Sequence, residues 1–188
     1  MWFLKQRKIL INLLIMIFIW LTSSFDYFLI MFLVNTFQRV YICAIASSIS
    51  ELFAYAISGY FYSYFGAKMT LTVSFAISTV GGVVILAYGL QHEEAWTFVL
   101  LVILSKFGIA CAMNINFVAH QAIFPPLFAS AAMGYCGVLS RLFSTLSPLL
   151  AQMDEPLPMI CFTITAALSC FLSLFLQTDI KQKNSGVS

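Results

Sequence analysis

Long uninterrupted apolar runs constrain this 188-residue chain more than any other feature of its sequence. Stretches such as ILINLLIMIFIWL show none of the period-two alternation of membrane β-strands, and they are therefore assigned to helices. One helix needs ~20 apolar residues to cross the ~30 Å hydrocarbon core, and apolar residues make up 62% of the chain, enough for about six crossings. Charged residues make up only 9%, against about a quarter of a soluble domain, which excludes a water-soluble globule.

The runs predict an all-α membrane protein with six transmembrane helices and no room for a soluble domain. The predicted spans cover 9–34, 41–65, 69–90, 95–119, 127–152 and 157–177, with short tails at 1–8 and 178–188. Breaks rich in Gly, Pro and charged residues separate them. The first run is too long for the apolar region of a signal peptide and lacks a small-residue cleavage site, so we interpret it as a permanent span.

The placement of Lys and Arg predicts the orientation of these spans. If the N-terminus is cytoplasmic, one basic residue, Arg39, lies outside, and six lie inside: Lys5, Arg7, Lys8, Lys68, Lys181 and Lys183. We therefore expect both termini in the cytoplasm, and a plasma or internal membrane as the location. The lipid bilayer is the first expected partner, and nothing in the charge pattern favours nucleic acid.

The cysteines and histidines predict no metal, cofactor or catalytic site. The five cysteines have no CxxC spacing and are typical of small buried side chains: Cys43, Cys111, Cys136, Cys161 and Cys170. His92 and His120 fall far apart in predicted connecting segments. An intramembrane serine protease needs a Ser and a His facing each other from two spans, so an enzyme is the least favoured class.

Four ionisable residues fall inside the predicted spans, where each costs about 2.5–3.5 kcal/mol at a helix centre. They are Asp26, Glu51, Lys106 and Arg141, of which Asp26 falls in the outer half of its span and the others near the midplane. Such groups need a partner or water. We expect all four to face a common interior, either as pairs that hold the bundle together or as part of a substrate or ion pathway.

Polar and small residues recur at helical spacing around three of these charges. They form one stripe in each of three spans: Ser47, Glu51, Tyr55, Ser58 and Gly59; Lys106, Ala110 and Asn114, with Asn116 nearby; and Gly134, Gly137, Arg141, Ser144 and Thr145. The span at 69–90 carries a small-residue face that predicts close helix packing, formed by Ser74, Ser78, Gly81 and Gly82.

The stretch ELFAYAISGYFYSYFGAK, from Glu51 to Lys68, resembles the end of an even-numbered helix and the following cytoplasmic loop of the major facilitator superfamily. The loop pattern in that superfamily is G-x-x-x-D-(R/K)-x-G-(R/K)-(R/K). Gly59, Gly66 and Lys68 fit the pattern, whereas Ser63 replaces the acid and two basic positions are neutral.

Three further stretches are similar to the organic ion transporter branch, the carriers of organic cations, organic anions and carnitine. SKFGIACAMNINFV resembles its tenth helix, AMGYCGVLSRLFSTLSPLL its eleventh, and RKILINLLIMIFIWLTSSFDYF the start of its seventh. The resemblance covers essentially the whole chain and is to the C-terminal six-helix half. It implies one half of a major facilitator fold, built from two inverted three-helix repeats, and transport by alternating access.

The resemblance also implies roles for individual residues. The position of Arg141 is basic in anion carriers and acidic in cation carriers of this branch, so an organic anion is favoured. Lys106 and Glu51 are then its network partners, and Phe117 shapes the cavity with further residues. The expected substrate-binding set is Arg141, Lys106, Glu51, Tyr55, Asn114 and Tyr135.

Two functional hypotheses follow. In the first, the chain transports small organic ions as the C-terminal half of a carrier, or as a fragment of one, together with an N-terminal six-helix half or a second copy. In the second, it is a non-transporting half that acts as a membrane partner or regulator of a full-length carrier. Neutral residues at positions where the branch carries cytoplasmic charges motivate the second hypothesis: Ser63, Ala122 and Ala129.

Overall fold

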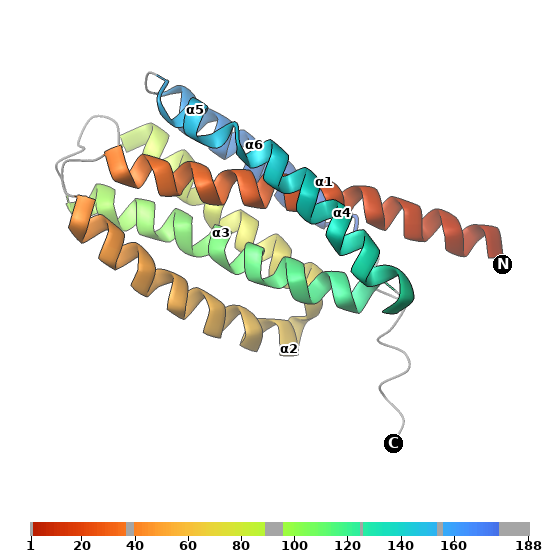
Figure 1. The fold of residues 1–188 in the computed structure, drawn as a ribbon. Helices are drawn as coiled ribbons and strands as arrows, with labels where there is room; N and C mark the ends of the chain where they lie inside the picture. The colour runs from red at the N-terminus through yellow and green to blue at the C-terminus, as the bar shows by residue number, and fades with distance from the viewer. Residues whose placement is uncertain (1, 37–39, 89–95, 125, 154–155, 177–188) are drawn as a thin grey trace.

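A computed structural model describes the backbone over 2–36, 40–88, 96–124, 126–153 and 156–176, and the side chains over 10–33, 41, 44–87, 100–124, 129–153 and 156–176. Within these ranges the chain is helical apart from short turns, which confirms the all-α prediction. The helices are α1 (Trp2–Thr36), α2 (Val40–Tyr88), α3 (Trp96–Ile123), α4 (Pro126–Ser144), α5 (Ser147–Ala151) and α6 (Leu157–Ser173). They lie lengthwise beside one another as an elongated bundle (Figure 1).

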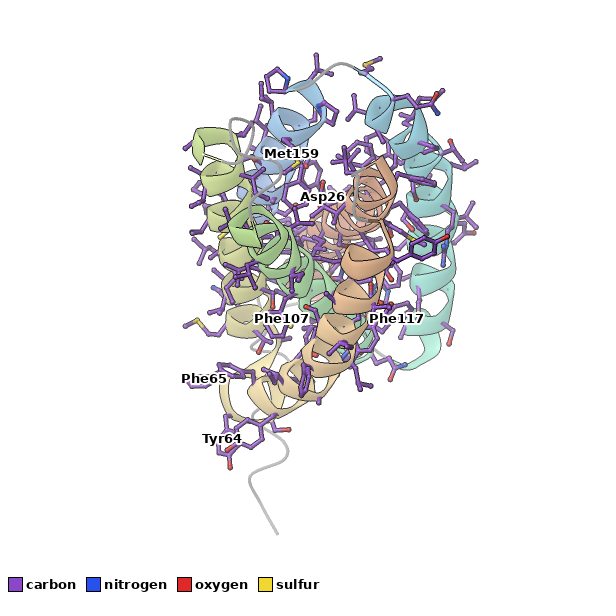
Figure 2. The ribbon with its side chains drawn as sticks, turned by 90° about the vertical axis from the view of Figure 1, so that its left-hand side faces the viewer. Asp26, Tyr64, Phe65, Phe107, Phe117 and Met159 are labelled. Atoms are coloured by element: carbon purple, nitrogen blue, oxygen red, sulfur yellow. The ribbon has the colours of Figure 1, made fainter. Side chains whose placement is uncertain are left out.

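Three of these helices are long and apolar enough to cross a membrane. The candidate spans are Leu10–Leu33 in α1, Ala44–Ala87 in α2 and Leu100–Ile123 in α3, and α6 is a shorter apolar helix. Large apolar side chains stay exposed on the outside, among them Tyr64 and Phe65, which point away from the bundle (Figure 2). Such a surface fits contact with lipid better than contact with water.

Several charged side chains on which the predicted orientation depends lie outside the described side chains. The backbone of Lys5, Arg7 and Lys8 belongs to α1, but their side chains are not described. Other basic residues, together with four acids and one histidine, lie wholly outside the described part of the chain: Arg39, His92, Glu93, Glu94, Asp154, Glu155, Lys181 and Lys183.

Gly66 divides α2 into two arms. Its φ of 75° and ψ of 174° lie outside the helical region, in a conformation that glycine adopts without a steric penalty. The second arm turns back, so that α3 contacts both arms (Figure 1). From the first arm, the Ser50 hydroxyl donates to the Ile103 carbonyl of α3. From the second arm, the Ser78 hydroxyl donates to the Ser105 carbonyl of α3.

The second arm of α2 packs unusually close to α3 and α6. A Cβ atom on Gly108 would lie 2.7 Å from the Ser74 carbonyl oxygen and 2.8 Å from the Ser78 nitrogen. Gly81 and Gly82 approach α3 and α6 as closely. The small-residue face therefore permits close packing, as predicted.

The helix predicted at 127–152 is interrupted, contrary to expectation. α4 ends at Ser144, and α5 begins at Ser147 with Pro148 in its first turn. Proline has no backbone N–H, and its ring clashes with the preceding turn, so the helix stops and starts again. The Ser147 hydroxyl donates to the Phe25 carbonyl of α1 at 3.0 Å, which holds this break against α1.

α1 lies at the centre of the bundle. It packs against α3, α4, α5 and α6, and it contributes side chains to both larger hydrophobic clusters. Met16, Ile19 and Trp20 belong to the first cluster, and Phe25 and Leu29 to the second. Polar residues in the middle of α1 also contact other helices, because Thr22 bonds to Ser169, Ser23 to Asn116 and Tyr27 to Glu51.

We expect Gly66→Ala to lower the free energy of unfolding by about 1–3 kcal/mol, because a side chain is strained at this positive φ. Gly59→Ala is the matched control: it lies in the same helix, and nothing surrounds its Cβ position within 4 Å. It should be neutral or stabilise the fold by about 0.5–1 kcal/mol. Thermal unfolding of the purified protein in detergent measures both, and equal midpoints for the two variants would contradict the bend.

We expect Gly108→Ala to destabilise the protein by about 1–3 kcal/mol, because the added methyl group overpacks the contact between α2 and α3. Gly137→Ala, whose Cβ position is open, provides the comparison. Chemical denaturation followed by circular dichroism gives the two unfolding free energies. A Gly108→Ala variant as stable as Gly137→Ala would show that the helices are not in close contact.

Candidate functional site

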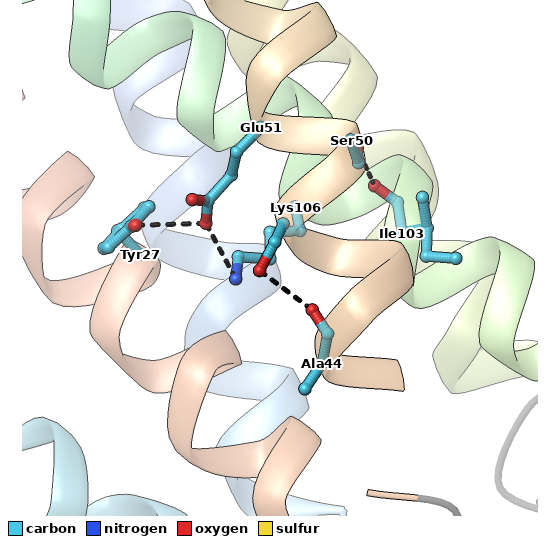
Figure 3. Close-up of polar contacts among 7 residues, drawn as sticks. Tyr27, Ala44, Ser50, Glu51, Ile103 and Lys106 are labelled. Atoms are coloured by element: carbon cyan, nitrogen blue, oxygen red, sulfur yellow. Dashed lines mark hydrogen bonds and ion pairs between the residues drawn. The ribbon is translucent and has the colours of Figure 1, made fainter. Parts of the chain in front are cut away.

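A buried ion pair joins α2 to α3. Lys106 Nζ lies 2.8 Å from Glu51 Oε1, and the two side chains are only 8% and 19% exposed. Tyr27 of α1 donates its hydroxyl hydrogen to the same carboxylate oxygen at 3.0 Å (Figure 3). The Lys106 ammonium also lies 5.6 Å from the centroid of the Tyr27 ring, within range of a cation–π interaction. Three helices thus meet at one neutral polar cluster.

Two further residues of the expected set lie next to this pair. Tyr55 is one turn after Glu51 on α2 and interacts electrostatically with Glu51 and Tyr27. Asn114 of α3 donates from Nδ2 to the Ser58 hydroxyl at 2.8 Å and more weakly to the Tyr55 carbonyl at 3.4 Å. These contacts extend the polar seam between α3 and the first arm of α2.

Arg141 does not take part in this ion pair. It is exposed in the last turn of α4, and its guanidinium carbon lies 5.6 Å from the centroid of the Phe28 ring of α1. It forms no ion pair with any residue that the structure describes. The expected network of Arg141 with Glu51 and Lys106 is not present as an ion pair: the described partners of the Glu51 carboxylate are Lys106 and Tyr27.

The two expected aromatic residues outside this seam occupy different surroundings. Tyr135 of α4 is 72% exposed and makes no described contact with the ion pair. Phe117 of α3 packs edge-on against Trp20 of α1, with ring centroids 4.7 Å apart. The structure therefore brings together Glu51, Lys106, Tyr55 and Asn114, but not Arg141 or Tyr135.

Consecutive residues of α1 face three different helices, because each step along an α-helix turns by about 100°. Tyr27 faces the ion pair and Phe28 faces Arg141. Asp26 faces α6, where its Oδ1 lies 2.6 Å from the Thr165 hydroxyl. Asp26 is therefore buried inside the bundle, but its described partner is on α6 and not at the Glu51–Lys106 pair.

A buried polar cluster between α1 and α3 was not predicted from the sequence. Asn116 donates from Nδ2 to the Ser23 hydroxyl at 2.6 Å, and His120 lies edge-on to Trp20 with ring centroids 6.3 Å apart. His120 is not in a connecting segment as expected, because α3 continues to Ile123. The spacing of four between Asn116 and His120 was the signal that would have placed both on one helical face.

The residues of the expected loop motif surround the bend of α2. Gly59 is exposed in the first arm, Gly66 forms the bend, and Lys68 begins the second arm. The Ser63 hydroxyl donates to the Gly59 carbonyl of its own helix at 3.1 Å. Lys68 forms no ion pair with the residues that the structure describes.

The described side chains offer charge and hydrogen bonding rather than metal chemistry. No group of three His, Cys, Asp or Glu among them is placed to hold a metal ion. The described cysteines are free: Cys111, Cys136, Cys161 and Cys170. Cys43 has no described side chain.

Apolar helices around a buried ion pair are features of a membrane protein, and comparison with known proteins points to the transporter class. No known family profile matches the chain. It is 27% identical over 188 residues to a candidate transporter of Caenorhabditis elegans, covering 97% of this chain and 37% of that protein. It is 27% identical over 176 residues to mouse organic cation/carnitine transporter 2, covering 92% and 31% of the two chains. It is 26% identical over 176 residues to mouse solute carrier family 22 member 21, covering 92% of this chain and 30% of that protein.

These relatives are transporters, which confirms the resemblance to the organic ion transporter branch. The chain spans about a third of the length of the curated relatives it matches.

We expect Lys106→Met and Glu51→Gln each to destabilise the protein by about 3–5 kcal/mol, because each leaves the partner charge unpaired in a buried position. The double variant should lose clearly less than the sum of the two single losses, since no unpaired charge remains. Unfolding free energies in detergent complete this double-mutant cycle. Strictly additive losses would show that the two groups do not form a pair in solution.

Proposed function

We propose that the chain takes part in the transmembrane transport of small organic ions, with an anion favoured, as the C-terminal half of a facilitator-type carrier or a fragment of one. Transporters among its curated relatives support a transport role. The observation that carries the preference for an anion is Arg141, an exposed cation on α4 without an ion-pair partner among the described residues.

The charge balance of the polar side chains supports this preference. Lys106 and Glu51 neutralise each other, whereas Arg141, beside Phe28 of α1, has no ion-pair partner among the described residues. A guanidinium group offers two parallel N–H donors to a carboxylate or similar anion. One mouse relative is named for organic cations and carnitine. The sign of the charge at Arg141 is the reason to favour an anionic group in this chain.

We further propose six membrane crossings: α1, the two arms of α2, α3, α4 together with α5, and α6. The candidate span Ala44–Ala87 has 44 residues, about twice the ~20 that one crossing needs, and Gly66 divides it. In Figure 1 the start of α1, the bend of α2 and the end of α3 lie toward the same end of the bundle. Basic residues lie at the start of α1 (Lys5, Arg7 and Lys8) and beside the bend of α2 (Lys68). They support a cytoplasmic position for that end of the bundle and for both termini.

Alternating access requires a second wall around the substrate. We propose that an N-terminal six-helix half, or a second copy of the chain, supplies it. The curated relatives are about three times as long as the matched region, which supports the first source. Exposed side chains on α2 and α4, on either side of α1, fit such a contact: Leu52, Phe53, Tyr135 and Leu142. In this arrangement α1–α2 and α3–α6 are the two inverted repeats.

The alternative function is a non-transporting half that binds or regulates a full-length carrier. Ser63 supports it, because the described partner of its hydroxyl is in its own helix, at a position where the transporter branch carries an acid. Neither function includes catalysis, in keeping with relatives that are transporters rather than enzymes. The genomic sequence upstream of Met1 separates them, since six further spans in the same frame favour the carrier.

We expect Arg141→Gln to reduce the uptake of a labelled organic anion into proteoliposomes by about 10- to 100-fold, the equivalent of a charge-assisted hydrogen bond of about 1.5–3 kcal/mol. Arg141→Lys should retain part of the uptake, because it keeps the charge but loses the paired donors. Lys181→Gln removes a positive charge in the C-terminal tail and serves as the control. Equal uptake by the original protein and Arg141→Gln would exclude Arg141 from the substrate site.

A further inference from the structure

Asp26 is a buried carboxyl group that the proposed function does not use. It lies inside the bundle on the central helix α1 and has no exposed surface (Figure 2). Its Oδ1 is 2.6 Å from the Thr165 hydroxyl oxygen of α6. Its Oδ2 is buried and has no hydrogen-bond partner among the described residues.

No described cation neutralises Asp26. Lys106 is paired with Glu51, and Arg141 packs against Phe28. The other described titratable side chains of the surrounding helices form no ion pair or hydrogen bond with it: Tyr41, Tyr55, Tyr60, Tyr62, Tyr64 and Lys68 on α2, Cys111 and His120 on α3, Tyr135 and Cys136 on α4, and Cys161 and Cys170 on α6. An ionised carboxylate with one hydrogen bond and no counterion is strongly disfavoured in such surroundings, and the group takes up a proton instead.

The contacts of Thr165 leave room for a proton on Asp26. The Thr165 hydroxyl oxygen lies 2.8 Å from the Cys161 carbonyl and 3.0 Å from the Phe162 carbonyl of its own helix. A hydroxyl group has one hydrogen, which Thr165 can donate either to a carbonyl of α6 or to Asp26 Oδ1. When a carbonyl of α6 accepts it, the 2.6 Å contact with Asp26 needs a hydrogen from Asp26, and a protonated carboxyl group supplies it.

A row of hydroxyl groups continues from this contact along α6. Thr165, Ser169 and Ser173 are spaced by four residues and so share one face of the helix. The Ser169 hydroxyl lies 2.5 Å from that of Thr22 on α1, and the Ser173 hydroxyl lies 2.7 Å from that of Thr72 on α2. The row ends at the last residue of α6. Hydroxyl groups both donate and accept hydrogen bonds, so this face of α6 carries buried polar groups between Asp26 and the end of the helix.

We propose that Asp26 is a proton-binding site, with the carboxyl group neutral in this conformation and its hydrogen donated to Thr165. When water reaches the row of hydroxyl groups, the O–H bond of Asp26 breaks, water takes the proton, and the carboxylate remains. Return of a proton from the aqueous side restores the acid. The use of this cycle to drive solute transport rests on the proposed function, whereas the protonation of Asp26 does not.

Infrared spectroscopy of the purified protein tests the protonation directly. We expect the carbonyl stretching band of a protonated carboxylic acid at neutral pH. The band should be absent in Asp26→Asn and present in Glu51→Gln, since Glu51 is ionised in its pair with Lys106. Thr165→Val should move the band to higher frequency by removing the hydrogen bond, and Thr165→Ser should leave it in place. No acid band at neutral pH, or a band that survives Asp26→Asn, would overturn the proposal.

Solute uptake into proteoliposomes with and without an inward proton gradient tests the coupling. We expect the gradient to raise uptake several-fold in the original protein and to have no effect in Asp26→Asn. Uptake that is equal with and without the gradient would refute the coupling and leave transport standing. An acid band without any uptake would refute the proposed function and leave the proton site standing.

Discussion

The free-energy cost of placing polar groups in an apolar interior governs this structure. The backbone meets that constraint by forming helices, which satisfy their own hydrogen bonds. The side chains meet it by pairing: the Lys106 ammonium finds the Glu51 carboxylate, and Tyr27 completes the cluster from a third helix. Because this cluster joins α1, α2 and α3, the same contacts that neutralise the charges also fix how the three helices lie against one another.

α1 transmits this constraint to the rest of the bundle. Three consecutive residues, Asp26, Tyr27 and Phe28, contact α6, the ion pair and Arg141. A rotation of α1 by one residue would break all three contacts together, at a cost that includes leaving polar groups without partners. The rotational position of the central helix is therefore set by its polar residues, while the apolar clusters above and below this level supply the burial.

The sequence predicted those features that depend on composition and on periodicity within one helix. Apolar runs indicated the helices, and the Gly66 stretch indicated a break. Periodicity gives the angle between residues of one helix but not the neighbour that each residue meets. It therefore did not predict that Asp26 faces α6 or that Arg141 forms no ion pair with Glu51. His120 was misplaced because the predicted span ended where hydropathy fell, although the helix continues to Ile123.

Lys106 and Arg141 have different surroundings, and these surroundings are the reason for the different roles that we propose for them. Lys106 is buried, paired and beneath an aromatic ring, so a change that drew it toward a substrate would leave Glu51 unpaired. Arg141 is exposed and rests on an aromatic ring without an acidic partner among the described residues, so it can bind an anion without breaking an existing pair. The hypotheses of structural pairing and of a substrate pathway are therefore compatible, because the ion pair joins α2 to α3, whereas Arg141 of α4 lies against α1.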